Sequence, residues 1–200
     1  MKNETFIYQE KIRSGTLPKT ILRCLVYLLN YWRTLPCQVA YLISSRKQLV
    51  NSDFGSYRNI VRTLVFSKHN RNLFYHRMGR SSILYSWLLP GENSLKLPFS
   101  CKLGMHAIFV HNDSCHLNAE RIGDHFVCYP HVVIGSKSLS SKKKPTIGNN
   151  VTIGTGAVIV GDISIGSNVK IAANSFVCES VPNNCIVKGN PSKCLLRSES

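Results

Sequence analysis

The sequence predicts a mainly β protein with a helical N-terminal region, and two observations carry this prediction. The first is an aliphatic residue that recurs at every sixth position through most of residues 122–181. A period of six fits neither an amphipathic helix nor a lone alternating strand, but it fits a parallel β-solenoid in which each hexad is one flat side of a coil. The second is composition, because the chain before about residue 94 is basic and partly apolar and lacks this period.

The hexads also predict which residues stack. Three sides of six residues make a coil of eighteen, and the Gly, Asn or Asp beside several anchors suits a corner that needs a positive φ. Cys128 occupies an anchor position, where a free thiol acts as a small hydrophobe. The expected stacks join anchors one coil apart: Ile147 on Ile165, Ile153 on Ile171, and Ile159 on Val177.

These patterns divide the chain into three regions. Residues 1–94 form the basic helical region, and residues 95–182 form the solenoid. Within the solenoid, residues 135–146 break the repeat with three consecutive lysines, which cannot line a core, so we expect a protruding loop there. Residues 183–200 form a turn-rich C-terminal tail.

The charge of the chain suggests an anionic partner. The net charge of +15 is concentrated in residues 1–96, which hold 15 Lys and Arg against 4 Asp and Glu. A membrane surface, a polyanionic saccharide or a phosphorylated cofactor would fit this charge. No nucleic-acid-binding motif accompanies the charge, so we expect no nucleic-acid partner. The eight cysteines form no CxxC pair and no signal peptide precedes them, which favours a reducing cytoplasm.

The apolar stretch at residues 20–45 has two interpretations. Its longest uncharged runs are 9 and 12 residues, which is too short to span a bilayer. It could lie on the inner membrane surface as an amphipathic segment, or form a pair of helices that pack against each other or against a neighbouring subunit. Further along, we expect a solvated face of arginines: Arg58, Arg62, Arg71, Arg77 and Arg80.

Two segments resemble a known family. The run IVKGNPSK at residues 186–193 is similar to the closing segment of the hexapeptide-repeat acyltransferases, and FVHNDSCHLNAERIG at residues 109–123 resembles their serine acetyltransferase branch. That branch includes the O-acetyltransferases of surface-polysaccharide synthesis. The resemblance covers residues 97–196, about half of the chain. It implies a left-handed parallel β-helix that assembles as a homotrimer.

The resemblance also implies a reaction, the transfer of an acetyl group from acetyl-CoA to a hydroxyl without a metal. A histidine general base suits this chemistry, because a neutral imidazole can take the hydroxyl proton and pass it to the leaving thiolate. Spacing alone does not choose among the five solenoid histidines, but the family alignment assigns the role to His111, with His116 as the alternative. The resemblance also implies that the C-terminal tail closes the groove that holds acetyl-CoA. By the same alignment the acetyl-CoA residues are Thr155, Gly156, Ala172, Ala173 and Lys193.

The acceptor stays open between L-serine and a polysaccharide sugar. In serine acetyltransferases an acidic residue orients the catalytic histidine, and a second histidine follows later in the chain. Here Lys96 and Lys144 stand at those two positions, and Glu179 stands where the family has a lysine. Asp113 or Glu120 could replace the acid. These departures favour a sugar, whereas the overall pattern is nearest to serine acetyltransferases. Two other classes remain, a non-catalytic β-helix scaffold and a basic membrane-associated binding module.

Overall fold

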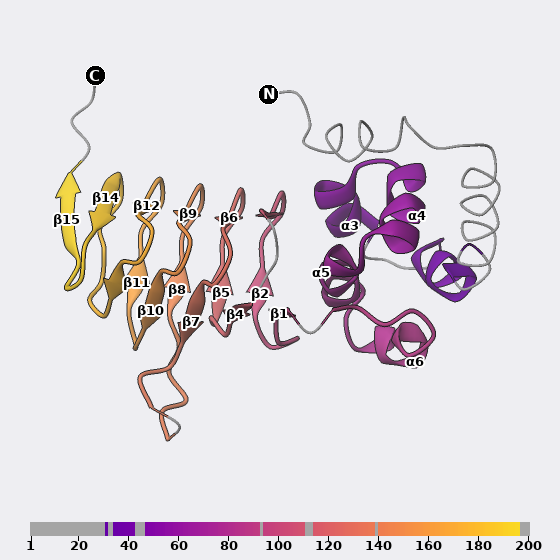
Figure 1. The fold of residues 1–200 in the computed structure, drawn as a ribbon, viewed down its shortest axis with the longest axis horizontal. Coiled ribbons are helices and arrows are strands. Elements are labelled where there is room, and N and C mark those ends of the chain that lie inside the picture. Colours follow the sequence, from indigo (N-terminus) through magenta and orange to yellow (C-terminus); the bar gives the residue numbers. More distant parts are fainter. Residues whose placement is uncertain are drawn as a thin grey trace, which may run out of the picture.

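The fold is seen in a computed structural model, which describes residue 31 and residues 34–42, 47–92, 94–110, 114–138 and 140–196. Within these ranges, helices occupy the chain up to Ser86 and short strands occupy it from Leu95. Figure 1 shows two adjoining parts, a helical part and an elongated stack of coils. No helix in the described ranges is long and apolar enough to cross a membrane.

The helical part is built around one apolar core. The helical segment at residues 34–42 contributes Cys37 and Tyr41 to this core, so this half of the apolar stretch packs against the other helices. The half at residues 20–30 lies outside the described residues. The remaining helices are α3 (Lys47–Phe54), α4 (Tyr57–Phe66), α5 (Lys68–Met78), the 3-10 turn η2 (Arg80–Ser82) and α6 (Ile83–Ser86).

Helix α5 closes the open end of the solenoid. Its Leu73 is buried in the solenoid core, not in the helical core. A solenoid exposes unpaired backbone groups and apolar side chains at its ends, so it needs such a cap. Side chains of α5 donate hydrogen bonds to carbonyl oxygens of the first coil: Asn72 to Leu95 at 3.1 Å, His76 to Cys101 at 3.0 Å, and Arg77 to Leu103 at 2.7 Å and Gly104 at 2.6 Å.

A buried ion pair completes this junction. Arg77 of α5 binds Asp53 of α3 at 2.5 Å, and the two side chains are only 2% and 1% exposed. Asp53 also accepts the backbone N–H of Ala107, in the first coil, at 2.9 Å. Burial raises the pKa of the Asp53 carboxyl, while Arg77 and the Ala107 N–H oppose this rise. One carboxylate therefore connects two helices and the solenoid.

The expectation that the arginines form a solvated face is wrong for two of them. Arg71 and Arg77 are 5% and 2% exposed. Arg71 donates to the carbonyl oxygens of Leu64, Val65 and Pro90, as Arg77 does to the first coil. The five N–H donors of a guanidinium can satisfy several carbonyl oxygens at once, which makes burial tolerable. Arg58, Arg62 and Arg80 are exposed as expected.

Three parallel sheets form the sides of the solenoid. The chain passes from one sheet to the next at each corner, so every third strand belongs to the same sheet. Sheet A contains β1 (Leu95–Lys96), β4 (Cys115–Leu117), β7 (Val133–Gly135), β10 (Val158–Val160) and β13 (Phe176–Val177). Sheet B contains β2 (Lys102–Leu103), β5 (Arg121–Ile122), β8 (Thr146–Ile147) and β11 (Ser164–Ile165). Sheet C contains β3 (Ile108–Phe109), β6 (Val127–Cys128), β9 (Thr152–Ile153), β12 (Lys170–Ile171), β14 (Cys185–Lys188) and β15 (Lys193–Leu196).

The predicted stacking is confirmed. Anchors one coil apart are strand partners and are almost completely buried, as is Cys128. Burying one such aliphatic side chain stabilises the fold by about 1.5–3 kcal/mol, so every further anchor in the stack adds to the stability. The observed pairs are Ile147 with Ile165, Ile153 with Ile171, and Ile159 with Val177.

A protrusion interrupts the stack after β7. Ile122 pairs with Ile147, 25 positions later, whereas Ile147 pairs with Ile165, 18 positions later, so this coil carries seven additional residues. They leave the sheet between Gly135 and Thr146, and Figure 1 shows the chain there extending away from the coils. At the base of the protrusion Lys143 binds Asp162 at 2.5 Å, with both side chains largely exposed.

The stack continues beyond residue 182, where the hexad pattern placed its end. Val181 bridges to Ile165, and Val187 of β14 pairs with Ile171, so the last coil has a step of 16 residues. This shorter step breaks the period of six, which is why the pattern alone missed it. β15 then turns back and pairs antiparallel with β14.

We expect Arg77→Met to lower the free energy of unfolding by about 3–5 kcal/mol, because it leaves the buried Asp53 carboxylate without its cation. Urea unfolding followed by circular dichroism measures this loss. Arg77→Met combined with Asp53→Leu should be more stable than Arg77→Met alone, because the orphaned charge is then gone. Lys143→Met, which removes an exposed ion pair, is the control and should leave the unfolding midpoint unchanged. Equal shifts in Arg77→Met and Lys143→Met would contradict the structural importance of the junction.

Candidate functional site

Four of the predicted acetyl-CoA residues lie together at two consecutive corners between sheets C and A. Thr155 and Gly156 turn the chain between β9 and β10, and Ala172 and Ala173 turn it between β12 and β13. The backbone N–H of Asn174 donates to the Thr155 carbonyl oxygen at 2.9 Å, which joins the corners directly. Their roles in binding stay predictions.

The corners approach each other closely because their residues are small. A Cβ added to Gly154 would lie 2.6 Å from the backbone nitrogen of Ala173. Gly156 has a φ of +71°, and a Cβ there would lie 2.3 Å from the Asn174 side-chain oxygen. Ala172, Ala173 and Thr155 are themselves exposed. Thr155, Ala172 and Ala173 therefore present only small side chains to a ligand arm that passes these two corners.

Lys193 lies at the far end of the solenoid, on β15. It pairs with Lys188 across the antiparallel strands, and both side chains are exposed. The sequence analysis did not select Lys188. The hairpin makes the two lysines neighbours, and two ammonium groups are suited to a polyphosphate. Only the antiparallel return of β15, which the hexad pattern did not predict, could have revealed this pair.

The predicted catalytic residue His111 lies outside the described residues, as does Asp113. The alternative base, His116, points outward from β4 and is the strand partner of Lys96 of β1. Glu120, the other candidate for the orienting acid, is exposed at a different corner.

The family's second histidine position holds Lys144, which is partly buried at the end of the protrusion near Cys101. Burial raises the pKa of the Cys101 thiol to about 11, against the lowering effects of the Ala119 backbone and Lys144. Lys144 therefore lies at the first coils, on the side where the protrusion rejoins sheet B.

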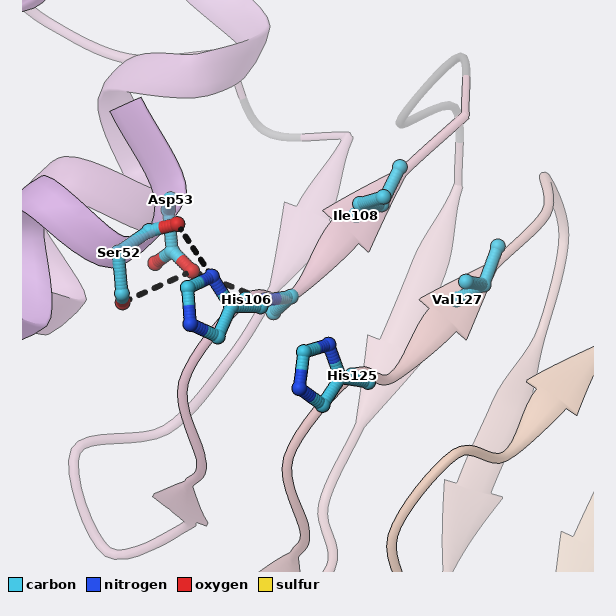
Figure 2. A pocket seen from close by; sticks show the side chains of 7 residues that line it. Ser52, Asp53, His106, Ile108, His125 and Val127 are labelled. Carbon is cyan, nitrogen blue, oxygen red and sulfur yellow. Dashed lines mark hydrogen bonds between the residues drawn. The ribbon is translucent and has the colours of Figure 1, made fainter. Parts of the chain in front are cut away.

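A second polar cluster, which the sequence analysis did not detect, lies at the junction with α3. His106 and His125 occupy consecutive corners between sheets B and C, and Figure 2 shows their rings side by side next to Ser52 and Asp53. The ring centroids are 4.8 Å apart and the ring planes differ by 11°. The sequence contained a signal, since both histidines follow a glycine by two positions. Their proximity to α3, about fifty positions away, was not visible.

Metal ligation finds no support in the part of the chain that the structure describes. Among those residues, no three His, Cys, Asp or Glu side chains lie close enough together to hold an ion.

Residues 144–179 match the family model described as bacterial transferase hexapeptide (six repeats). Over these residues the solenoid is a hexapeptide repeat of this type. The match covers both corners with the predicted acetyl-CoA residues.

Two curated relatives also overlap part of the chain. A serine acetyltransferase from Synechococcus elongatus is 42% identical over 78 residues, which is 38% of this chain and 32% of that protein. A serine acetyltransferase from Staphylococcus xylosus is 44% identical over 72 residues, which is 36% of this chain and 33% of that protein. The chain thus spans about a third of the length of the curated relatives it matches.

Solved structures resemble the hexapeptide-repeat chain over a larger part of its length. Soybean serine acetyltransferase complexed with serine superposes with a TM-score of 0.66 at 22% identity, covering 78% of this chain and 72% of that one. The Neisseria gonorrhoeae serine acetyltransferase gives a TM-score of 0.64 at 22% identity, covering 98% and 85%. At these identities the likeness concerns the fold alone. The Brucella abortus serine acetyltransferase in complex with coenzyme A gives 0.57 at 25% identity, covering 77% and 66%.

These findings confirm the predicted fold class. The hexapeptide-repeat solenoid is a left-handed parallel β-helix, and helices precede it.

Proposed function

We propose that this protein is an acetyl-CoA-dependent O-acetyltransferase that resembles serine acetyltransferases. The observation that carries this proposal is the pair of joined corners holding Thr155, Gly156, Ala172 and Ala173. These corners lie inside the repeat that matches the family. The Brucella abortus relative, in complex with coenzyme A, supports the cofactor. Lys193, with Lys188 beside it, would bind the nucleotide phosphates, and the C-terminal hairpin would close the cofactor groove.

The proposed reaction is a direct acyl transfer. The acceptor hydroxyl oxygen attacks the thioester carbonyl carbon while His111 takes the hydroxyl proton. A backbone N–H at a corner stabilises the oxyanion that develops. The C–S bond then breaks, the acetyl ester forms, and the proton passes to the departing thiolate to give free coenzyme A. Holding both substrates in one site lowers the activation barrier further, because the reacting groups are already positioned together.

L-serine is the acceptor that the relatives favour, because the matched curated proteins are named serine acetyltransferases. A saccharide hydroxyl is the second candidate, because Lys96 and Lys144 replace two residues of the family's serine site. We further propose that the protein works in the cytoplasm as a homotrimer, in which acetyl-CoA lies between neighbouring copies.

We expect free-thiol release from acetyl-CoA in the presence of L-serine or of a saccharide acceptor, with a loss of about 10²–10⁴-fold in turnover for His111→Ala. A thiol-reactive dye measures the release against a panel of both acceptor classes. His116→Ala is the matched control and should keep its turnover. Light scattering of both variants checks that they assemble as the wild type does. Turnover that depends on His116 and not on His111 would show that the family register is displaced. An absence of turnover and of coenzyme A binding would leave the scaffold as the explanation.

We expect Ala173→Trp to weaken coenzyme A binding at least tenfold, because an indole at this exposed corner would obstruct the path past Thr155. Calorimetric titration with coenzyme A measures the affinity. Lys137→Trp places the same side chain on the protrusion and should bind as the wild type does. Unchanged affinity in Ala173→Trp would place the cofactor elsewhere.

A peripheral interaction with the membrane surface is a second candidate property, and α6 carries the observation that favours it. Ile83, Leu84 and Trp87 are 61%, 79% and 71% exposed at the end of the helical part. The exposed Arg80 precedes them, in the half of the chain that holds most of the net positive charge. Clustered apolar side chains with basic neighbours suit the interface of an anionic bilayer.

We expect the protein to co-sediment with phosphatidylglycerol vesicles and not with phosphatidylcholine vesicles. Leu84→Ser combined with Trp87→Ser should reduce the bound fraction at least tenfold. Leu195→Ser, which removes an exposed leucine from β15, is the control. Equal binding of all variants would mean that α6 does not contact lipid.

A further inference from the structure

A cavity of about 390 Å³ lies between α3 and the first two coils. Ser52 and Asp53 of α3 form one wall, and His106 and His125 stand opposite them on consecutive corners. Ile108 and Val127, the outward residues of β3 and β6, provide an apolar floor. A cavity of this size, with an apolar surface and a few convergent polar groups, has the properties of a small-molecule site.

The protonation of His106 follows from its partner. Its Nδ1 lies 3.0 Å from the Ser52 carbonyl oxygen, which can only accept a hydrogen bond. Nδ1 therefore carries the hydrogen, and Nε2 is left to accept when the ring is neutral or to donate when it is charged. The ring nitrogens of His125 have no hydrogen-bond partner among the described residues, and its ring stacks in parallel on that of His106.

The backbone does not require histidine at these corners. His106 and His125 have φ values of 58° and 55°, in the left-handed region that asparagine tolerates best among residues with side chains. Asparagine occupies the equivalent corner in the three following coils, at Asn150, Asn168 and Asn184. Those amides form a ladder, with Asn150 donating to Asn168 at 3.1 Å and Asn168 to Asn184 at 2.9 Å. The two imidazoles end this ladder at the point where α3 covers the corners.

The charges around the cavity favour an anion. Both oxygens of the Asp53 carboxylate accept hydrogen bonds from Arg77, and one also accepts the Ala107 N–H, so the acid in the wall is neutralised by its partners. The neighbouring carboxylate Asp124 accepts the Met105 N–H at 2.7 Å. Two parallel rings 4.8 Å apart repel each other when both are charged, and a bound anion would relieve this repulsion.

We propose that this cavity binds a small molecule with an anionic oxygen group, a carboxylate or a phosphate, whose apolar part contacts Ile108 and Val127. The imidazoles of His106 and His125 donate hydrogen bonds to the anion. Because the walls come from both α3 and the solenoid, the ligand also strengthens the junction between the two parts. The site is separate from the acetyl-CoA corners and does not depend on the proposed function.

Titration of the full-length protein with inorganic phosphate, and separately with acetate, tests this site. Side-chain signals of the histidines are followed by NMR at pH 6.0 in 150 mM sodium chloride, which screens weak surface attraction. We expect saturable shifts of the His106 and His125 signals.

Asparagine substitutions make matched variants, since the backbone accepts asparagine at these corners. His106→Asn and His125→Asn should each weaken phosphate binding at least tenfold, while the unfolding midpoint without phosphate stays close to that of the wild type. His131→Asn is the control, because His131 is exposed at a corner of another column with a φ of 60°. Equal weakening in His131→Asn, or shifts that never saturate, would overturn the proposal in favour of diffuse attraction by the net charge. Shifts with zinc ions and none with phosphate or acetate would overturn it in favour of a metal site.

Discussion

Asp53 and Arg77 form a buried ion pair inside the helical part, and both side chains also bind the first coil of the solenoid. Asp53 and Arg77 are both almost inaccessible to water, so each charge depends on the other and on the backbone groups around them. Arg77 directs its remaining donors to carbonyl oxygens at the end of β2, and Asp53 accepts an N–H at the following corner. A buried pair of this kind adds little net stability compared with apolar residues, but loss of either partner leaves a buried charge unpaired. The position of α3 and α5 on the first coil, and hence the shape of the cavity beside α3, follows from that geometry.

The sequence predicted what is periodic in this fold and missed what is not. Ile147, Ile153 and Ile159 could be paired with their partners because every coil in that stretch repeats the same requirement for an inward aliphatic side chain. The last coil, with its step of 16 residues, keeps the requirement but changes the spacing, so Val187 could not be assigned to the stack. Arg77 shows a different limit. A charged residue is usually exposed, and only partners such as Asp53 and Leu103, distant in the chain, make its burial favourable.

The same distinction applies to the candidate sites. Ala173 was selected through the family pattern, and the stacking that brings it to Thr155 follows from the hexad period. His106 and His125 sit in regular corner positions too, and His131 occupies a corner with the same left-handed backbone. What separates them is α3, which covers one corner column at its beginning and leaves the others open. Sequence patterns within a repeat therefore find sites built by the repeat alone. A site built by the repeat and a distant helix needs the tertiary structure.

The two sites also differ in how their ligands would act on the protein. The proposed acetyl-CoA corners lie within regular coils, where β9, β10 and β12 are paired on both sides and β13 forms the edge of its sheet. Binding there should change the surface of the solenoid more than its shape. The His106–His125 cavity instead spans two parts that are joined by the side chains of α3 and α5 and by the Ala107 N–H. A ligand bound there would stabilise the junction between the two parts. Its effect should therefore appear first in the helical part. Of the two proposed sites, the one in the repeat would therefore be the more rigid, and the one where the repeat begins the more responsive.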